Sequence, residues 1–283
     1  MKITLTIDLE DPTLRYAPDG RYIPMTKHIL DLCDETGNRK ATFFTVGRVA
    51  QVAPQLIRDI AERGHEIAYH SHDHVSLTQE EPQRFRRECA EDKDRLEQLA
   101  GKSVIGFRAP RFSLTPQTLW ALDVLKELGF RYSSSVMPTE VSLFGFPGAP
   151  SQSRLRGALE EGVPQSSRDE KINTPFMWPN GMIEFPLPVA PIGKYRLPYL
   201  GGIYLYTMPF FAVRAFLAKA RAEEVLWTYA HPYDFDNGEK FLRMAKTPFW
   251  ISFVLWRARR GAAKKIRKVL ELGSAPPLCE RLP

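Results

Sequence analysis

The feature that most constrains the fold is a regular alternation of segments typical of strands with segments typical of helices. Short stretches of β-branched and aromatic residues are followed by amphipathic stretches of roughly 10–15 residues. The expected strands are residues 3–9, 40–47, 65–71, 103–110, 130–136 and 225–232, and the expected helices are residues 26–37, 54–64, 79–99, 115–129 and 208–224. This alternation indicates βαβ units and therefore a mainly parallel sheet that can close into a barrel.

One stretch interrupts the alternation. Residues 138–180 are rich in Pro, Gly and Ser, and we expect them to form a loop insertion rather than a second domain. Regular patterns resume at residues 182–190. We therefore interpret residues 1–283 as a single barrel domain that carries this insertion and ends in a basic helical segment at about residues 247–270.

The cysteines and the first residues bear on the compartment. The chain has three cysteines, Cys33, Cys89 and Cys279, far apart and odd in number, which argues against a disulfide framework and fits a reducing environment. The sequence opens with an alternating strand pattern and not with the apolar run of a signal peptide. We expect a cytoplasmic location, at the inner face of the membrane if the basic segment binds lipid.

The net charge of +6 is concentrated near the end of the chain. Residues 241–270 contain nine Lys and Arg and no Asp or Glu, so the rest of the chain has a net charge of −3. This distribution does not suggest a nucleic-acid-binding surface. The apolar run Pro248–Trp256 is too short for a bilayer span, which needs roughly 20 residues. The segment is either a helix that covers the barrel or a helix that contacts an anionic membrane surface.

Polar residues follow several of the expected strands. In barrels of parallel strands, the reactive side chains gather at the carboxyl ends of the strands. The residues at these positions are Asp8, Glu10 and Asp11 after the first strand, His70, His72 and His74 after the third, Arg108 and Ser133 after the fourth and fifth, and His231 after the last. We expect these side chains to meet at one mouth of the barrel.

Four of the six histidines lie within residues 64–74, and two of them have the spacing of metal ligands. His70 and His74, four residues apart, can form with one carboxylate a three-ligand site that leaves positions open for water and substrate. A second carboxylate can act as a base and another histidine as an acid, which is the machinery of metal-assisted amide or ester hydrolysis. We assign structural or supporting roles to His28, His65 and His72.

Five motifs, in order along the chain, resemble a known family. The segments TIDLED, RGHEIAYHSHDH, FRAP and AHP, together with KATFFTVG, are similar to those of the polysaccharide deacetylases, the NodB-homology family or carbohydrate esterase family 4. The resemblance extends from residue 3 to about residue 237. Segments such as LGFRYSSSV and AHPYDFD further resemble a subgroup found with exopolysaccharide and lipid-linked-sugar pathways. The resemblance implies a distorted (β/α)7 barrel.

The resemblance also implies roles for single residues. Asp8 matches the catalytic base, Arg108 the arginine that holds the base, and His231 the general acid. Arg111 occupies the position whose backbone N–H helps to bind the oxyanion. His70 and His74 match the metal-binding histidines, and the metal-binding carboxylate is Glu10 or Asp11.

The sequence departs from the family pattern at two places. The family usually has two adjacent aspartates, whereas here Asp8 is followed by Leu9, Glu10 and Asp11, so the third ligand is ambiguous. Alternation along a strand places Asp8 and Glu10 on the same face and favours Glu10, although Pro12 permits a turn that would present Asp11.

The second departure concerns the acid histidine. Ser133 stands where the family usually has an aspartate that pairs with this histidine. Either His231 has a lowered pKa, or another carboxylate such as Asp234 takes that place.

These features together predict a metal-dependent hydrolase that removes an N-acyl group, acetyl or formyl, from a lipid-linked or nucleotide-linked amino sugar. Zn²⁺ is the expected metal, with Co²⁺, Ni²⁺ and Fe²⁺ as alternatives. Two other interpretations remain open: a non-catalytic sugar-binding barrel and an iron oxygenase with two histidines and one carboxylate.

Overall fold

The computed structural model describes residues 2–138, 173–193, 195–241 and 249–283. Eight strands form one sheet in the order β10-β1-β2-β3-β4-β5-β7-β6, and every neighbouring pair is parallel except β6 with β7. The strands are β1 (Ile3–Leu9), β2 (Ala41–Thr45), β3 (Glu66–Tyr69), β4 (Gly106–Phe107), β5 (Tyr132–Ser133), β6 (Phe176–Met177), β7 (Ile183–Glu184) and β10 (Leu226–Ala230). A separate antiparallel pair consists of β8 (Val189–Ile192) and β9 (Tyr195–Pro198).

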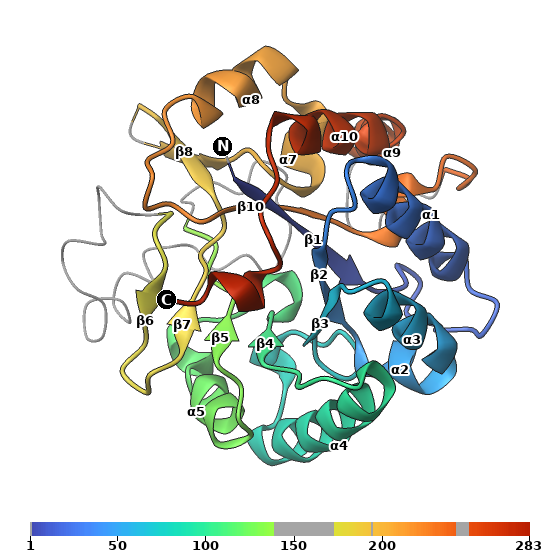
Figure 1. Cartoon of the computed structure of the whole chain (residues 1–283), viewed down its shortest axis with the longest axis vertical. Helices are drawn as coiled ribbons and strands as arrows, with labels where there is room; N and C mark the ends of the chain where they lie inside the picture. Colours follow the sequence, from blue (N-terminus) through green and yellow to red (C-terminus); the bar gives the residue numbers. More distant parts are fainter. Residues whose placement is uncertain (1, 139–172, 194, 242–248) are drawn as a thin grey trace.

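Helices surround the curled sheet on its outer side (Figure 1). They are α1 (Tyr22–Glu35), α2 (Gly47–Val52), α3 (Pro54–Glu62), α4 (Pro82–Ala100), α5 (Trp120–Glu127), α7 (Gly202–Thr207), α8 (Phe210–Leu217), α9 (Phe249–Arg259) and α10 (Ala262–Leu272). Strands and helices alternate along the chain as far as β5, and the parallel strands curl into a distorted barrel. The expected (β/α)7 barrel class is confirmed.

The central strand β1 shows how the sequence pattern becomes two packed layers. All of its residues are buried, because it lies between β10 and β2. Ile3, Leu5 and Ile7 belong to the main core cluster, in which strands pack against the helices. The alternate residues Thr6 and Asp8 face the barrel interior, where both contact one arginine. Because side chains alternate along the strand, these polar residues point into the barrel.

Several elements differ from the sequence-based expectation. The helix expected at residues 208–224 is shorter, since α8 ends at Leu217 and the chain then turns to enter β10. Val225 N–H, just before that strand, donates to the Asn173 carbonyl. Strands β4 and β5 are also shorter than expected. After them, Arg108 Nη2 donates to Ser134 Oγ and the Ala109 backbone N–H donates to Ser135 Oγ.

The C-terminal tail covers the end of the barrel at which the amino-terminal ends of β1, β2 and β3 lie. Leu278 belongs to the interior cluster, and its backbone N–H donates to Thr42 Oγ1 at 2.9 Å. Cys279 N–H donates to Glu66 Oε2 at 3.1 Å, and Thr4 Oγ1 donates to the Pro276 carbonyl at 2.8 Å. In Figure 1 this tail enters the ring of strands. The opposite end of the barrel is formed by the carboxyl ends of the parallel strands.

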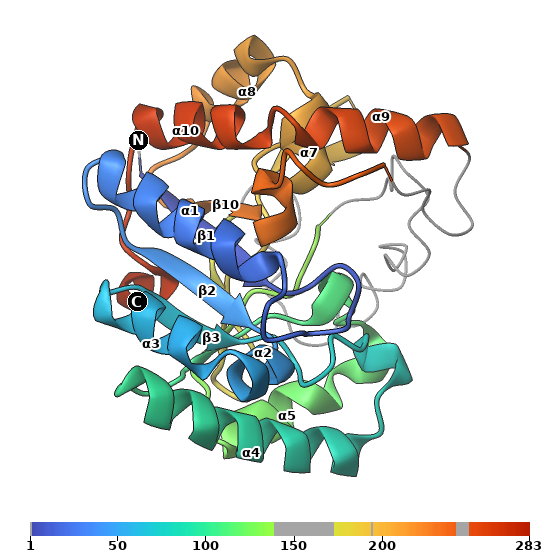
Figure 2. The same ribbon diagram turned by 90° about the vertical axis from the view of Figure 1, so that its right-hand side faces the viewer.

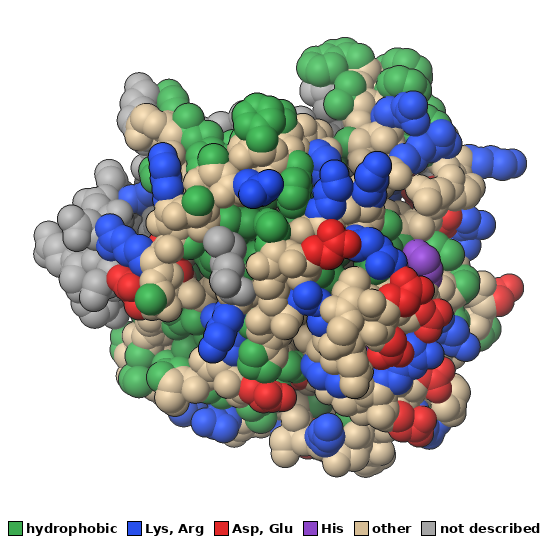
Figure 3. Space-filling view, turned by 45° about the horizontal axis from the view of Figure 1, so that its top comes forward, with side chains coloured by type: hydrophobic (Ala, Val, Ile, Leu, Met, Phe, Trp, Pro, Cys, Tyr) green, Lys and Arg blue, Asp and Glu red, His purple; other side chains and the backbone are tan. Residues whose placement is uncertain are grey.

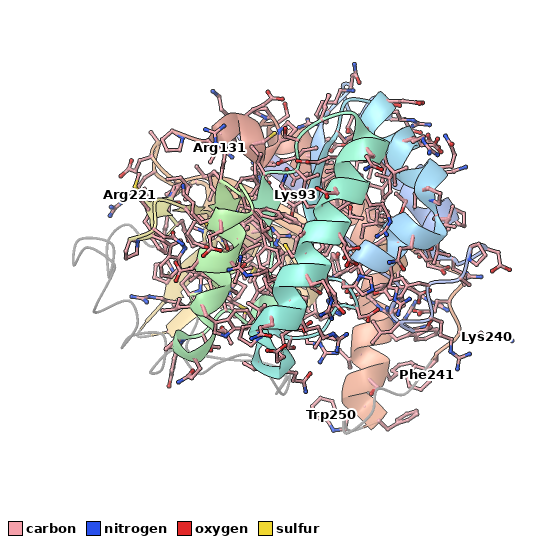
Figure 4. The ribbon with its side chains drawn as sticks, turned by 90° about the horizontal axis from the view of Figure 1, so that it is seen from below. Lys93, Arg131, Arg221, Lys240, Phe241 and Trp250 are labelled. Carbon is pink, nitrogen blue, oxygen red and sulfur yellow. The ribbon has the colours of Figure 1, made fainter. Side chains whose placement is uncertain are left out.

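The basic C-terminal segment forms two helices separated near Gly261. Helix α10 covers the barrel: Ile266, Val269 and Leu270 are buried in the main core. Helix α9 extends beyond the sheet (Figure 2), with Trp250 at its outer end (Figure 4). Within the described ranges, no helix is both long and apolar enough to cross a bilayer. The insertion expected at about residues 138–180 lies mostly outside the described residues, and the single-domain interpretation of residues 1–283 stays a prediction.

Candidate active site

A buried ion pair lies at the carboxyl-terminal end of the barrel. Arg108 Nη1 and Asp8 Oδ1 are 2.5 Å apart, and Arg108 is completely buried. The guanidinium also donates to Thr6 Oγ1 at 3.0 Å and to the Ser134 carbonyl and Oγ, both at 3.1 Å. Its Cζ lies 3.9 Å from the centre of the Phe44 ring. A buried charge with this many partners is held in one place, and it orients the Asp8 carboxylate.

Three residues near this pair are arranged as metal ligands. One ligand atom from each of Glu10, His70 and His74 lies within 4.8 Å of the other two. Glu10 Oε2 is buried and lies 2.6 Å from His74 Nε2, yet it makes no hydrogen bond of acceptable geometry. A carboxylate and two imidazoles form a donor set that suits Zn²⁺ and related divalent metals, so these residues fit the expected ion.

The backbone after β3 explains how both histidines reach one point. Ser71 and His74 have left-handed conformations, with φ of 64° and 57°, so the chain turns tightly between the two imidazoles. His70 Nδ1 lies 2.7 Å from the Arg108 carbonyl oxygen. Since a carbonyl can only accept, Nδ1 carries the proton and Nε2 keeps a free lone pair for a ligand.

Burial and neighbouring charges together shift the pKa values of Glu10 and His70. Burial alone would raise the pKa of the Glu10 carboxyl, but His74, His231 and His70 outweigh it and lower this pKa to about 2. Burial lowers the pKa of His70 to about 4, against the opposing effect of Asp8. Glu10 is therefore ionised and His70 neutral at physiological pH, the forms that bind a metal.

Asp11 lies outside this group. Its Oδ1 accepts hydrogen bonds from the Thr13 backbone N–H and from Thr13 Oγ1, both at 2.7 Å. The turn that Pro12 permits therefore uses the Asp11 side chain to stabilise the loop. The structure brings Glu10, and not Asp11, to His70 and His74.

His231 lies on the other side of Glu10, with 3.8 Å between its Nε2 and Glu10 Oε1. Its Nδ1–H donates to Asp234 Oδ2 at 2.9 Å, and Tyr206 O–H donates to the same oxygen at 2.8 Å. Burial alone would lower the pKa of His231, but Asp234, followed by Glu10 and Asp8, raises it to about 9. The raised pKa favours the protonated form of this imidazole at neutral pH.

This geometry favours one of the two alternatives left open at Ser133. Asp234 Oδ2 pairs with His231 Nδ1, and its charge raises the pKa of His231. Ser133 Oγ donates instead to Ser135 Oγ at 2.8 Å, next to buried Glu184, which accepts from the Ser135 and Val136 backbone N–H groups. Ser133 belongs to a network that holds the chain after β5.

The remaining predicted residues have clear positions. Arg111 has a left-handed conformation with φ 55°, and its side chain is exposed. His72 Nδ1–H donates to buried Asp92 Oδ2 at 2.8 Å, and His65 Nδ1 accepts from the Ala41 backbone N–H at 3.0 Å. His28 packs edge-on against Phe235. The last three are structural contacts, as expected.

Sequence reasoning missed two aromatic residues of the site, Tyr206 and Tyr233. Tyr233 stacks on His231 with ring centroids 4.6 Å apart, and its hydroxyl donates to Glu10 Oε1 at 3.3 Å. Its position two residues after His231 was the only sequence signal. Tyr206 lies in α7, and nothing in its local sequence indicates a link to Asp234.

Comparison with known proteins gives the same family as the motifs. Residues 5–133 match the family described as polysaccharide deacetylase, and residues 134–274 match a domain of unknown function, DUF3473. A peptidoglycan deacetylase-like protein of Gibberella zeae is 28% identical over 156 residues, covering 53% of this chain and 45% of that protein. The peptidoglycan-N-acetylglucosamine deacetylase of Bacillus cereus is 31% identical over 106 residues, covering 37% of this chain and 38% of the enzyme.

The chain thus spans less than half the length of these two relatives. A crystal structure from Mycobacterium smegmatis, provisionally named a polysaccharide deacetylase, superposes with a TM-score of 0.56 and 20% identity. That match covers 99% of this chain and 89% of the other, which indicates a shared fold. Residues 5–133 thus match the polysaccharide deacetylase family of the NodB-homology type, and the barrel has the fold of the Mycobacterium smegmatis structure.

Proposed function

We propose that this protein is a metal-dependent hydrolase that removes an N-acyl group, acetyl or formyl, from an amino sugar. The observation that carries the proposal is the convergence of three parts at one mouth: the Asp8–Arg108 pair, the Glu10–His70–His74 group and the His231–Asp234 pair. These parts supply a base, a metal site and an acid, which hydrolysis of an amide requires.

Each residue has a separate task in this mechanism. Asp8, oriented by Arg108, takes a proton from the water whose oxygen attacks the acyl carbon. His231 gives its Nε2 proton to the sugar nitrogen as the C–N bond breaks, so that the products are a free amine and a carboxylic acid. The backbone N–H of Arg111 helps to stabilise the negative charge on the acyl oxygen. A divalent metal held by Glu10, His70 and His74 would act as a Lewis acid on that oxygen and make water more acidic.

The nature of the ligands supports Zn²⁺ as the metal, with Co²⁺, Ni²⁺ and Fe²⁺ as alternatives. An amino sugar is the proposed substrate, since one relative is named for N-acetylglucosamine. We further propose that this sugar is lipid-linked or nucleotide-linked and that the protein is cytoplasmic. Its three cysteines are free, which is consistent with a reducing compartment.

Helix α9 is the basis for a further part of this proposal, peripheral contact with an anionic membrane. Phe249, Trp250 and Phe253 are exposed, and Arg257 and Arg260 follow them. In Figure 3 hydrophobic side chains protrude at the upper right, beside Lys and Arg side chains. Trp250→Glu should abolish flotation of the protein with anionic vesicles at low salt, whereas failure of the unmodified protein to float would rule out this contact.

Turnover measurements test the hydrolase. Purified protein, stripped of metal and reloaded with Zn²⁺ or Co²⁺, is incubated with acetylated and formylated amino sugars in free, nucleotide-linked and lipid-linked form, and the released acid is measured. His231→Ala and Asp8→Asn should retain metal and lose roughly 10²–10⁴-fold in rate. Sugar binding without turnover in any metal-loaded sample would favour the non-catalytic barrel. Consumption of O₂ together with a keto-acid would favour the oxygenase.

A further inference from the structure

Tyr233 contacts both His231 and Glu10 in the candidate active site. Its ring stacks on the His231 imidazole at 4.6 Å between centroids, with only 9° between the planes. Its hydroxyl donates to Glu10 Oε1 at 3.3 Å. Tyr233 lies in the 3-10 helix Pro232–Phe235, which begins directly after His231 at the end of β10. This helix fixes the backbone of Tyr233. One side chain therefore contacts both the proposed acid and a proposed metal ligand.

The two oxygens of Glu10 have different surroundings. Oε2 faces His74 Nε2 at 2.6 Å, whereas Oε1 faces the Tyr233 hydroxyl and, at 3.8 Å, His231 Nε2. A donor on Oε1 fixes the rotation of the carboxylate and leaves Oε2 directed at the histidines. Groups that hydrogen-bond metal ligands in this way pre-orient them for binding.

The His231 ring is held from three directions. Asp234 Oδ2 accepts from Nδ1–H, Tyr229 packs edge-on at 5.8 Å between centroids, and Tyr233 covers one face. The stacked face fixes the plane in which Nε2 points toward the mouth. Loss of that face would leave the imidazole free to tilt about its bond to Asp234.

Arg259 of helix α9 also lies against the Tyr233 ring. Arg259 Cζ lies 5.3 Å from the centre of the Tyr233 ring, and its Nη2 pairs with Glu239 Oε2 at 2.7 Å. Trp256 Nε1–H, one turn earlier in the same helix, donates to the Glu239 carbonyl at 3.1 Å. The basic C-terminal segment is thereby connected to the site through one arginine and one aromatic ring.

We propose that Tyr233 is a positioning residue that orients Glu10 and His231 together, and that Arg259 of α9 acts on the site by holding Tyr233. The inference rests on the proposed function for the roles of Glu10 and His231. It assigns the C-terminal segment a task beyond covering the barrel: α9 completes the wall of the site. Tyr233 itself carries out no chemical step.

Metal affinity tests the hydroxyl independently of activity. Metal-free wild type, Tyr233→Phe and Tyr233→Leu are titrated with Co²⁺ alone and followed by calorimetry and by the Co²⁺ absorption spectrum. Tyr233→Phe should weaken Co²⁺ binding about 10- to 100-fold, the usual effect of losing a partner of a metal ligand. Tyr199→Phe, which alters a buried tyrosine that packs on Phe216, should bind Co²⁺ like the wild type.

The ring is tested by turnover at saturating metal. Tyr233→Phe keeps the stacked ring and should retain most of kcat, whereas Tyr233→Leu should lose a further factor of about 10 in kcat with little change in KM. Unchanged Co²⁺ affinity in Tyr233→Phe, or equal kcat in the two variants, would overturn the inference. Weakened Co²⁺ binding in a protein that hydrolyses no acylated amino sugar would support it and defeat the proposed function, while a wild type that binds no Co²⁺ would defeat both.

A double-mutant cycle tests the link to α9. Arg259→Met should lower kcat/KM several-fold in the wild type and have no further effect in the Tyr233→Leu background, because it acts through the ring. Equal losses in both backgrounds would show that Arg259 does not act through Tyr233.

Discussion

Replacing Asp234 by Asn should move the alkaline limit of activity to lower pH. Asn keeps an oxygen that can accept from His231 Nδ1–H and Tyr206 O–H, so the geometry at 2.9 Å and 2.8 Å can persist. The negative charge, however, is lost. The substitution therefore separates the charge of Asp234 from its hydrogen bonds.

The expected size of this shift follows from the groups that raise the pKa of His231. Burial alone would lower this pKa from its ordinary 6.5, and Asp234 is the first of the groups that raise it to about 9. A divalent ion on Glu10 would cancel the part supplied by Glu10 and leave the part supplied by Asp234. Without the Asp234 charge, the largest of the groups that oppose burial is lost, and we expect the pKa to fall toward its ordinary value.

The sign of the effect is set by the role of an acid. In the proposed mechanism His231 must be protonated to act, so activity should fall as pH rises through its pKa. With a pKa of about 9 the imidazole is about 97% protonated at pH 7.5, and with a pKa of 6.5 about 9%. The rate at pH 7.5 should fall by up to about tenfold, and the loss should shrink at pH 6.

The assay is the pH dependence of kcat/KM at saturating metal. Asp236→Asn is the matched control, because Asp236 lies two residues away and pairs with Arg21 at 2.5 Å. It should leave the alkaline limb in place. An alkaline limb that stays at the same pH in Asp234→Asn would refute the argument that this carboxylate keeps His231 protonated.

Three further outcomes follow from the same geometry. Glu10→Gln should lose most of its bound metal and Asp11→Asn should keep it, as elemental analysis of the purified variants will show; the reverse result would make Asp11 the ligand. Arg108→Met should destabilise the protein by about 3–5 kcal/mol in urea unfolding, since it leaves the Asp8 charge buried without its partner; a loss below about 1 kcal/mol would contradict this. Ser133→Asp should leave the pH profile of the rate unchanged and lower the melting temperature, because it places a second carboxyl next to one that is already buried; a shifted profile would mean that residue 133 does reach the acid.

Local periodicity carried much of the information about the fold. Alternation with a period of two identified β1, and apolar residues at helical spacing identified most of the helices that surround the barrel. Both periods are properties of consecutive residues, so they can be read without knowing which elements pack together. The ends of the strands then indicated where Asp8, His70 and Arg108 would meet.

The identity of partners depended on contacts between residues far apart in the chain. Arg108 reaches Asp8 across 100 residues, and Arg259 of α9 reaches Tyr233 only because α10 anchors the segment on the core. The C-terminal tail binds β2 through Leu278, a contact that no local sequence pattern indicated. Such contacts are selected by the packing of the whole barrel.

The sequence by itself determined the class of fold, the end of the barrel that holds the candidate site and the set of residues that gather there, because these follow from strand period, helix period and chain order. Only the tertiary structure brought Glu10, rather than Asp11, to His70 and His74, and Asp234, rather than Ser133, to His231. Those choices depend on how the chain turns after each strand. A turn of one or two residues redirects a side chain completely while leaving the hydrophobic pattern unchanged.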